Sequence, residues 1–219
     1  ESARKKRTEE LRLQKYNVEQ AVKERQKKFQ ERADKLVEEA AAKLLSDGIP
    51  AIGKVKETLA SALKDTELLE ARPEINEING VIQKAELIDS DILNSFVEQK
   101  GTEITVLLAA GSRKFTVDDV KDGKVYGSQK RVTGAASAVL PVVFALKDLS
   151  MAERLQRMGA DDQHHVALVK GLMFLFINNS QNARKYFEKT HPSLAQCLMG
   201  GMKEAVVKIS EGEAQRVMF

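Results

Sequence analysis

The fold class is decided by residues 101–127, which have the sequence GTEITVLLAAGSRKFTVDDVKDGKVYG. Apolar and β-branched residues alternate here with polar ones, which is the two-residue period of strands that are buried on one face. Asp122-Gly123 lies between two such runs and is typical of a tight hairpin turn. With the following segment, the pattern predicts four strands, at residues 102–108, 113–120, 124–131 and 137–146.

These strands predict a small antiparallel sheet or partial barrel, SH3-like or Sm-like in size, because they are short and separated by close turns. Pro141 in the last strand cannot donate a backbone hydrogen bond, so we expect that strand to lie at an edge or to contain a bulge.

The residues before the sheet have the period of amphipathic helices. Residues 1–47 contain no Gly or Pro, and their apolar side chains recur at spacings of mainly four and seven: Leu11, Val18, Val22, Phe29, Leu36, Ala40 and Leu44. The pattern predicts one helix of about 40 residues, whose C-terminal half packs on later helices while its basic start protrudes. Arg25 and Ala33 interrupt a strict heptad repeat, so a coiled coil stays open as an alternative.

Two more helices are expected before the sheet. Asp47-Gly48 predicts the end of the first helix, and Arg72-Pro73 predicts the end of the second. A third extends from about Glu74 to Gly101, and either Gly80 or the Asp89-Ser90-Asp91 step bends or divides it.

After the sheet the sequence returns to short helices. Ser150 and Glu153 predict a capping box, in which Glu153 accepts a hydrogen bond from the amide of its own cap residue. A helix ending near Asn178 and a partner capped by Ser180 follow. Gly200-Gly201 predicts the end of another helix, and a final helix carries Ala205, Val206 and Ile209.

The bulk composition excludes some classes of protein. The 35 Lys and Arg residues are nearly balanced by 32 Asp and Glu, which is typical of solvated helices rather than of a nucleic-acid footprint. No apolar run approaches the roughly 18 residues that a membrane span needs. Because the chain begins with Glu1, we expect a processed protein or a piece of a longer one, in which an upstream anchor would not be visible.

The span from Gly171 to Phe187 resembles one tetratricopeptide helical hairpin. Gly171, Phe174, Ala183 and Phe187 have the spacing of the small and aromatic residues in that repeat, and the resemblance covers about one repeat. It implies that Gly171 and Ala183 let two helices approach while the two Phe side chains fill the groove between them.

The longer order of elements is similar to the non-catalytic C-terminal region of some bacterial serine/threonine protein kinases. The resemblance covers most of the chain and rests on the charged first helix, GTEITVLL (101–108), DGKVYG (122–127), FALKDLSMAERLQRMG (144–159) and the helical pair. It implies a sensor, scaffold or docking region, because the Gly-rich loop, HRD and DFG motifs of a kinase domain are all missing.

Residues with reactive side chains do not form a recognisable set. His164-His165 are adjacent and point about 100° apart on a helix, so they do not make a metal pair, and we interpret them as surface or capping residues. Cys197 has apolar neighbours at helical spacing, which favours a core cysteine over a reactive thiolate. We expect no catalytic residues, no metal and no cofactor.

The sequence therefore predicts a non-enzymatic α+β protein in three parts: a helical region at 1–101, a small β domain at 102–149 and tetratricopeptide-like helices at 150–219. We expect it to dock a protein partner, or upstream domains of the same polypeptide, in a larger and membrane-anchored bacterial signalling protein. The predicted docking residues are Leu168, Leu172 and Phe176 on the concave side of the helical pair, and a buried helix that carries the same residues stays open as an alternative. The alternative is nucleic-acid binding by basic residues of the sheet, namely Lys114, Lys121, Lys124, Lys130 and Arg131.

Overall fold

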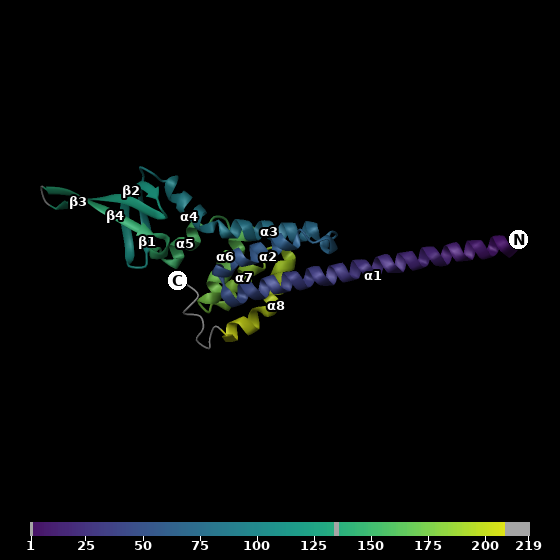
Figure 1. The fold of residues 1–219 in the computed structure, drawn as a ribbon. Helices are drawn as coiled ribbons and strands as arrows, with labels where there is room; N and C mark the ends of the chain where they lie inside the picture. Colours follow the sequence, from purple (N-terminus) through teal and green to yellow (C-terminus); the bar gives the residue numbers. More distant parts are fainter. Residues whose placement is uncertain (1, 134–135, 209–219) are drawn as a thin grey trace.

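The protein is described by a computed structural model, which covers residues 2–133 and 136–208 and confirms the α+β class. Figure 1 shows a body of packed helices, a small sheet at one end of it and one long helix that projects from the other end. The helices before the sheet are α1 (Ser2–Asp47), α2 (Ile52–Ala62), α3 (Arg72–Glu86) and α4 (Ile88–Val97). Those after it are α5 (Met151–Arg157), α6 (His164–Phe176), α7 (Ser180–Phe187) and α8 (Pro192–Lys208). Short 3-10 turns are η1 (Ile49–Ala51), η2 (Thr66–Leu68) and η3 (Leu146–Asp148).

The boundaries around α1, α3 and α4 follow the local chemistry. Gly48 has φ +67°, and a Cβ there would come 2.7 Å from the ring of Phe176, so the predicted helix end at Asp47-Gly48 is confirmed. The expected third helix is divided: α3 ends at Glu86 and α4 begins at Ile88, next to the Asp89-Ser90-Asp91 step rather than at Gly80.

The sheet is a four-stranded antiparallel meander in the order β1-β2-β3-β4. Its strands are β1 (Glu103–Leu108), β2 (Gly111–Lys121), β3 (Lys124–Thr133) and β4 (Ala136–Ala145), and β2 contains a register shift between Val117 and Asp119. Pro141 lies on β4, which is an edge strand, as predicted. The buried face packs on α4, where the ring of Phe96 meets that of Phe144 edge-on at 5.6 Å.

The other edge of the sheet is covered by the start of α5. Ser150 N donates to Leu107 O over 2.8 Å, and Leu107 N donates to Glu153 Oε2 over 2.9 Å. Ser150 Oγ accepts from Glu153 N, so one half of the predicted capping box is present. The other half is wrong, because the Glu153 carboxylate instead satisfies the free amide of β1 and accepts from Arg157 Nε over 2.6 Å.

Helices that precede the sheet in the chain and helices that follow it pack together into one helical body. α8 packs against α1 and α7, while α6 packs against α3, α7 and η1. One continuous apolar cluster includes Leu44, Ile78, Leu168 and Leu198. The three-part division of the chain stays a prediction.

The predicted end of a helix at Gly200-Gly201 is wrong, because α8 continues through both residues to Lys208. Gly201 faces Leu45 of α1, and a Cβ at Gly201 would lie 2.8 Å from the Leu45 Cδ1 atom. Contact with α1 therefore outweighs the low helix propensity of the two glycines. The expected final helix is the end of α8 as far as Lys208, and Ile209 lies outside the described residues.

Candidate docking surface

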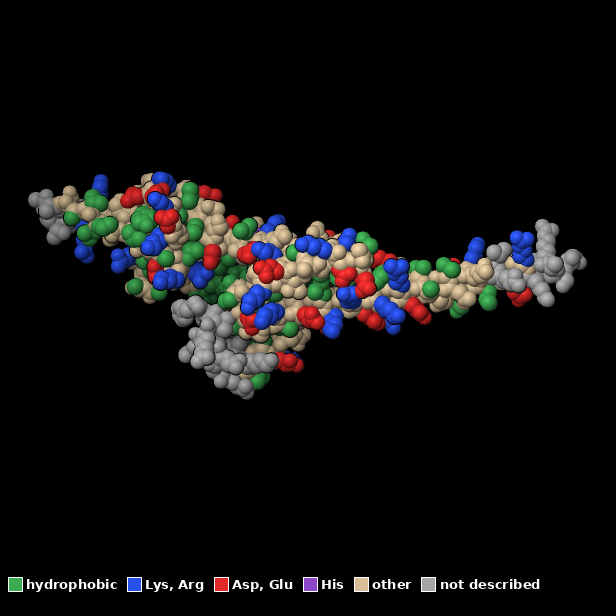
Figure 2. All heavy atoms as spheres, in the orientation of Figure 1, with side chains coloured by type: hydrophobic (Ala, Val, Ile, Leu, Met, Phe, Trp, Pro, Cys, Tyr) green, Lys and Arg blue, Asp and Glu red, His purple; other side chains and the backbone are tan. Residues whose placement is uncertain are grey.

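The helix α1 divides into two parts with different surroundings. We name residues 2–32 the arm and residues 33–47 the root. In the root, Ala33, Val37, Ala40 and Leu44 are buried. In the arm, every side chain described from Arg7 to Arg32 is exposed, apart from the partly covered Gln20 and Phe29. The prediction that the first helix packs by its C-terminal half and protrudes by its start is confirmed, and Figures 1 and 2 show the arm beyond the body.

One apolar stripe runs along both parts. At about 100° per residue its members fall within roughly 80° of the helix circumference. The stripe consists of Val18, Val22, Phe29, Ala33, Leu36, Ala40 and Leu44. Leu44 is 0% exposed, whereas Val18 is 63% and Val22 is 48% exposed. The face that forms part of the core in the root is therefore open to solvent in the arm.

Basic side chains flank the stripe on the arm. Within about a quarter turn of Val22, the described arm side chains include Arg7, Arg12, Lys15 and Arg25, against the single carboxylate of Glu19. The opposite half is balanced, since three lysines accompany three glutamates: Lys23, Lys27, Lys28, Glu9, Glu24 and Glu31. Residues 1–32 together hold 11 Lys and Arg and 6 Glu, a net charge of +5, so the rest of the chain carries −2.

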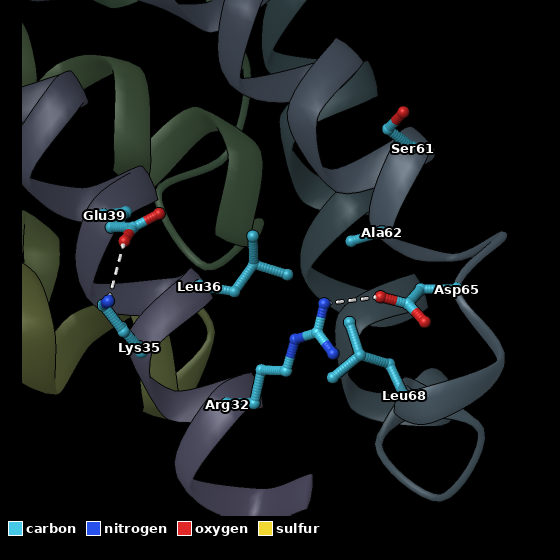
Figure 3. Close-up of a pocket in the computed structure, with 8 residues that line it drawn as sticks. All are labelled: Arg32, Lys35, Leu36, Glu39, Ser61, Ala62, Asp65 and Leu68. Atoms are coloured by element: carbon cyan, nitrogen blue, oxygen red, sulfur yellow. Dashed lines mark hydrogen bonds and ion pairs between the residues drawn. The ribbon is translucent and has the colours of Figure 1, made fainter.

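The stripe becomes covered where the arm meets the η2 turn. A hollow of about 410 Å³ lies between α1 and the α2–η2 segment, and its lining includes Leu36, Ala62 and Leu68 (Figure 3). At its rim, Arg32 Nη2 donates to Asp65 Oδ2 over 2.8 Å, and Arg32 also pairs with Glu67. The hollow thus has a mixed lining, in which Leu36, Ala62 and Leu68 lie among polar side chains, and an ion-paired rim.

A second hollow of about 520 Å³ lies nearer the tip of the arm. It is lined by Phe29 and neighbouring polar residues of α1, and by Glu70 and Ala71 from the other wall. Together the two hollows mark the place where intramolecular packing on the stripe ends.

The docking residues predicted from the sequence do not lie on an accessible surface. Leu168 and Leu172 are 0% exposed and Phe176 is 7% exposed, so the structure corrects their expected placement. The reason is that α6 is enclosed by α3, α7 and η1, which buries residues 166–173 without a break. A helix that is apolar on all sides is a core helix, and the run VALVKGLMFLF at 166–176 has this character apart from Lys170, which is paired with Asp161.

The predicted close approach of α6 and α7 at Gly171 is present. A Cβ on Gly171 would lie 2.5 Å from the ring of Phe187, so only glycine admits that ring, and Ala183 is fully buried. Phe174 stacks on Tyr186 with ring centroids 5.4 Å apart. Beneath this pair, Lys170 donates to Asp161 over 2.6 Å, which, with a weaker hydrogen bond from Tyr186, holds the pKa of Asp161 below its ordinary value.

The contacts of His164, His191 and Cys197 are those of structural residues. His164 Nδ1 is 2.8 Å from the carbonyl oxygen of Lys189, and His191 Nε2 is 3.3 Å from Glu77 Oε2. Burial raises the pKa of the half-buried Cys197 thiol, and the nearby carboxylates of Glu38, Asp34 and Glu74 raise it further. The thiol is therefore protonated at neutral pH. Among the described residues, no three His, Cys, Asp or Glu side chains are grouped to hold a metal ion.

The sheet presents few aromatic side chains to a nucleic acid. Phe115 and Phe144 are buried, which leaves the half-buried Tyr126 on the outer face. Lys114 is paired with Glu103 across the β1–β2 ladder at 2.7 Å. The outer face is therefore poorly suited to base stacking.

In the residues that the structure describes, no helix combines the length and the apolar character needed to cross a membrane. Comparison with protein-family models, with curated proteins and with solved structures gives no match for the chain.

Proposed function

We propose that the chain is a non-enzymatic interaction module that docks a protein partner through the arm of α1, within a larger bacterial signalling protein. The observation that carries this proposal is the stripe, which is buried in the root and uncovered at Val18 and Val22. The signalling context rests on the resemblance to the non-catalytic region of bacterial serine/threonine protein kinases.

The length and isolation of the arm support docking. Its 31 residues extend for roughly 45 Å, and most helical stability in proteins comes from packing an amphipathic face. Beyond the ion pairs of Arg32 with Asp65 and Glu67 at its base, the arm's described part is supported by local contacts such as the Lys27–Glu31 ion pair at 3.7 Å and the Gln30–Asp34 hydrogen bond at 2.8 Å. A partner on the stripe would supply the packing that the body supplies to the root.

Site-specific photo-crosslinking in the native host tests this proposal. A photoreactive residue placed at Val22 should capture a defined protein, whereas the same residue at Glu24, on the opposite side of the helix, should not. Replacing Val18 by Ser should then abolish the capture at position 22. Equal capture at positions 22 and 24, or capture that does not depend on Val18, would contradict docking by the stripe.

Nucleic-acid binding by the sheet is the second candidate. It is favoured by Lys121, Lys124, Lys130 and Arg131, which are exposed and form no ion pair within the described part of the chain. RNA binding that falls steeply with salt, and that is lost in a Lys130→Glu/Arg131→Glu variant, would support it.

A further inference from the structure

The charge of the arm restricts what can cover the stripe. Two copies of the chain would bring together two N-terminal segments, residues 1–32, of net charge +5 each. If the stripe is the seam of a two-helix pair, Lys15 and Arg25 also fall at seam positions. In a parallel pair, Lys15 would face Lys15 of the second copy, and Arg25 would face Arg25. In an antiparallel pair that places Val18 opposite Val22, Lys15 would face Arg25 of the second copy. Self-association therefore opposes like charges in both orientations.

Where the chain itself begins to cover the stripe, carboxylates pair with a basic residue at its edge. Arg32 lies at the edge of the stripe where the η2 turn begins to cover it, and that turn supplies the carboxylates of Asp65 and Glu67. Arg25 precedes Arg32 by seven residues and so lies on the same side of the stripe. Its guanidinium lies 5.1 Å from the ring of Phe29, and no carboxylate pairs with it in the described part of the chain.

We infer that the partner of the arm is an acidic amphipathic helix of about 20 residues. This inference rests on the proposed docking function. Its apolar side chains would cover Val18 and Val22, and its Asp or Glu side chains would meet Lys15 and Arg25, as Asp65 and Glu67 meet Arg32. From Arg12 to Phe29 the arm offers roughly 27 Å of helix, which sets the length of the contact.

Two other anionic partners fit the arm less well. A helix that lies on a membrane surface buries a broad apolar face, whereas this stripe spans roughly 80° and carboxylates occupy the opposite half. A nucleic acid would use the basic groups but would leave the stripe uncovered, because phosphate contacts need no apolar seam.

The test uses the 219-residue chain and a designed 21-residue helical peptide with Leu at a and d and Glu at e and g. A matched peptide with Lys at e and g is the control, and fluorescence anisotropy measures both. The acidic peptide should bind at least tenfold more tightly than the basic one. Val18→Ser/Val22→Ser should weaken its binding at least tenfold.

A pair of charge reversals separates position from net charge. Arg25→Glu should weaken binding of the acidic peptide about tenfold and should strengthen binding of the basic peptide. Lys27→Glu makes the same charge change on the opposite half of the helix and should alter either affinity less than twofold. Circular dichroism and thermal unfolding of each variant check that the body is intact.

Several outcomes would overturn the inference. They are no binding of the acidic peptide, equal binding of both peptides, or equal effects of the two charge reversals. Binding to phosphatidylserine vesicles or single-stranded RNA that is tighter than to the acidic peptide, and unchanged by Val18→Ser/Val22→Ser, would assign the arm to those ligands instead. If crosslinking at Val22 captures a partner without an acidic helix, docking survives and this inference fails.

Discussion

The root and the arm of α1 differ in surroundings although they share one helix and one stripe. α2, α8, η1 and η2 contact α1, and in the root Ala40 and Leu44 are buried. In the arm, the same stripe emerges beyond the body at Val18 and Val22. An apolar stripe on a helix therefore indicates a contact, and the same pattern serves whether the chain itself or another molecule provides that contact.

The largest expected difference between the two parts is in stability. Leu44→Ala should lower the free energy of unfolding by about 2–5 kcal/mol, because it removes a fully buried side chain and leaves a cavity. Val22→Ala should change it by less than about 0.5 kcal/mol, because the side chain is exposed in the free chain. Urea unfolding measures both values. Similar losses for the two variants would mean that the arm is packed in solution.

A smaller loss of stability is expected from a change in the packing of α6 on α7. Gly171→Ala should destabilise the chain by about 1–3 kcal/mol, because the new methyl group overlaps the ring of Phe187. Gly201→Ala on α8 is the matched control, since only the end of the flexible Leu45 side chain lies near it and helix propensity improves. Thermal unfolding should separate the two variants, and equal melting temperatures would contradict this account of α6–α7 packing.

A loss of helix stability of about 1 kcal/mol, confined to the arm, is expected from a glycine substitution. Ala21→Gly lowers helix propensity by about that amount, and no tertiary contact in the described structure compensates for it. Helicity measured by circular dichroism should fall, while the urea midpoint of the body stays unchanged. A shift of that midpoint would show that arm and body unfold together.

The smallest predicted effect depends on pH. The pKa of Asp161 is lowered in the folded chain, chiefly by the hydrogen bond from Lys170, so its contribution to stability is present at neutral pH and is lost as the pH falls through the folded pKa. Asp161→Asn should remove this dependence. Unfolding midpoints at pH 7 and pH 3 should therefore differ less in the variant than in the parent chain, and an equal difference would contradict the assignment.

Much of the fold could be predicted because its signals are local. The alternation around Phe115 and Val125 identified the strands, and Gly48 identified the end of α1. The predictions that were wrong concern places where tertiary contacts determine the local structure. α8 continues through Gly200 and Gly201 because it packs on α1, and Glu153 turns to β1 because Leu107 has a free amide.

The candidate surface was only partly predictable. The sequence located Val18 and Val22 on an apolar stripe, but their exposure depends on where α2, η2 and α8 stop covering α1. Leu168 was expected on the concave side of the helical pair, but it is fully buried because α3, α7 and η1 enclose α6. The apolar run of α6, which is interrupted only by Lys170, is the signal that favours a core helix.

Hydrogen exchange on the intact chain, with and without the acidic peptide, is the decisive measurement of docking by the stripe. We predict that amides from Arg12 to Phe29 exchange rapidly in the free chain and become protected when the peptide binds, while the root remains protected in both states. Slow exchange of these amides in the free chain, or peptide-induced protection confined to the sheet, would contradict it.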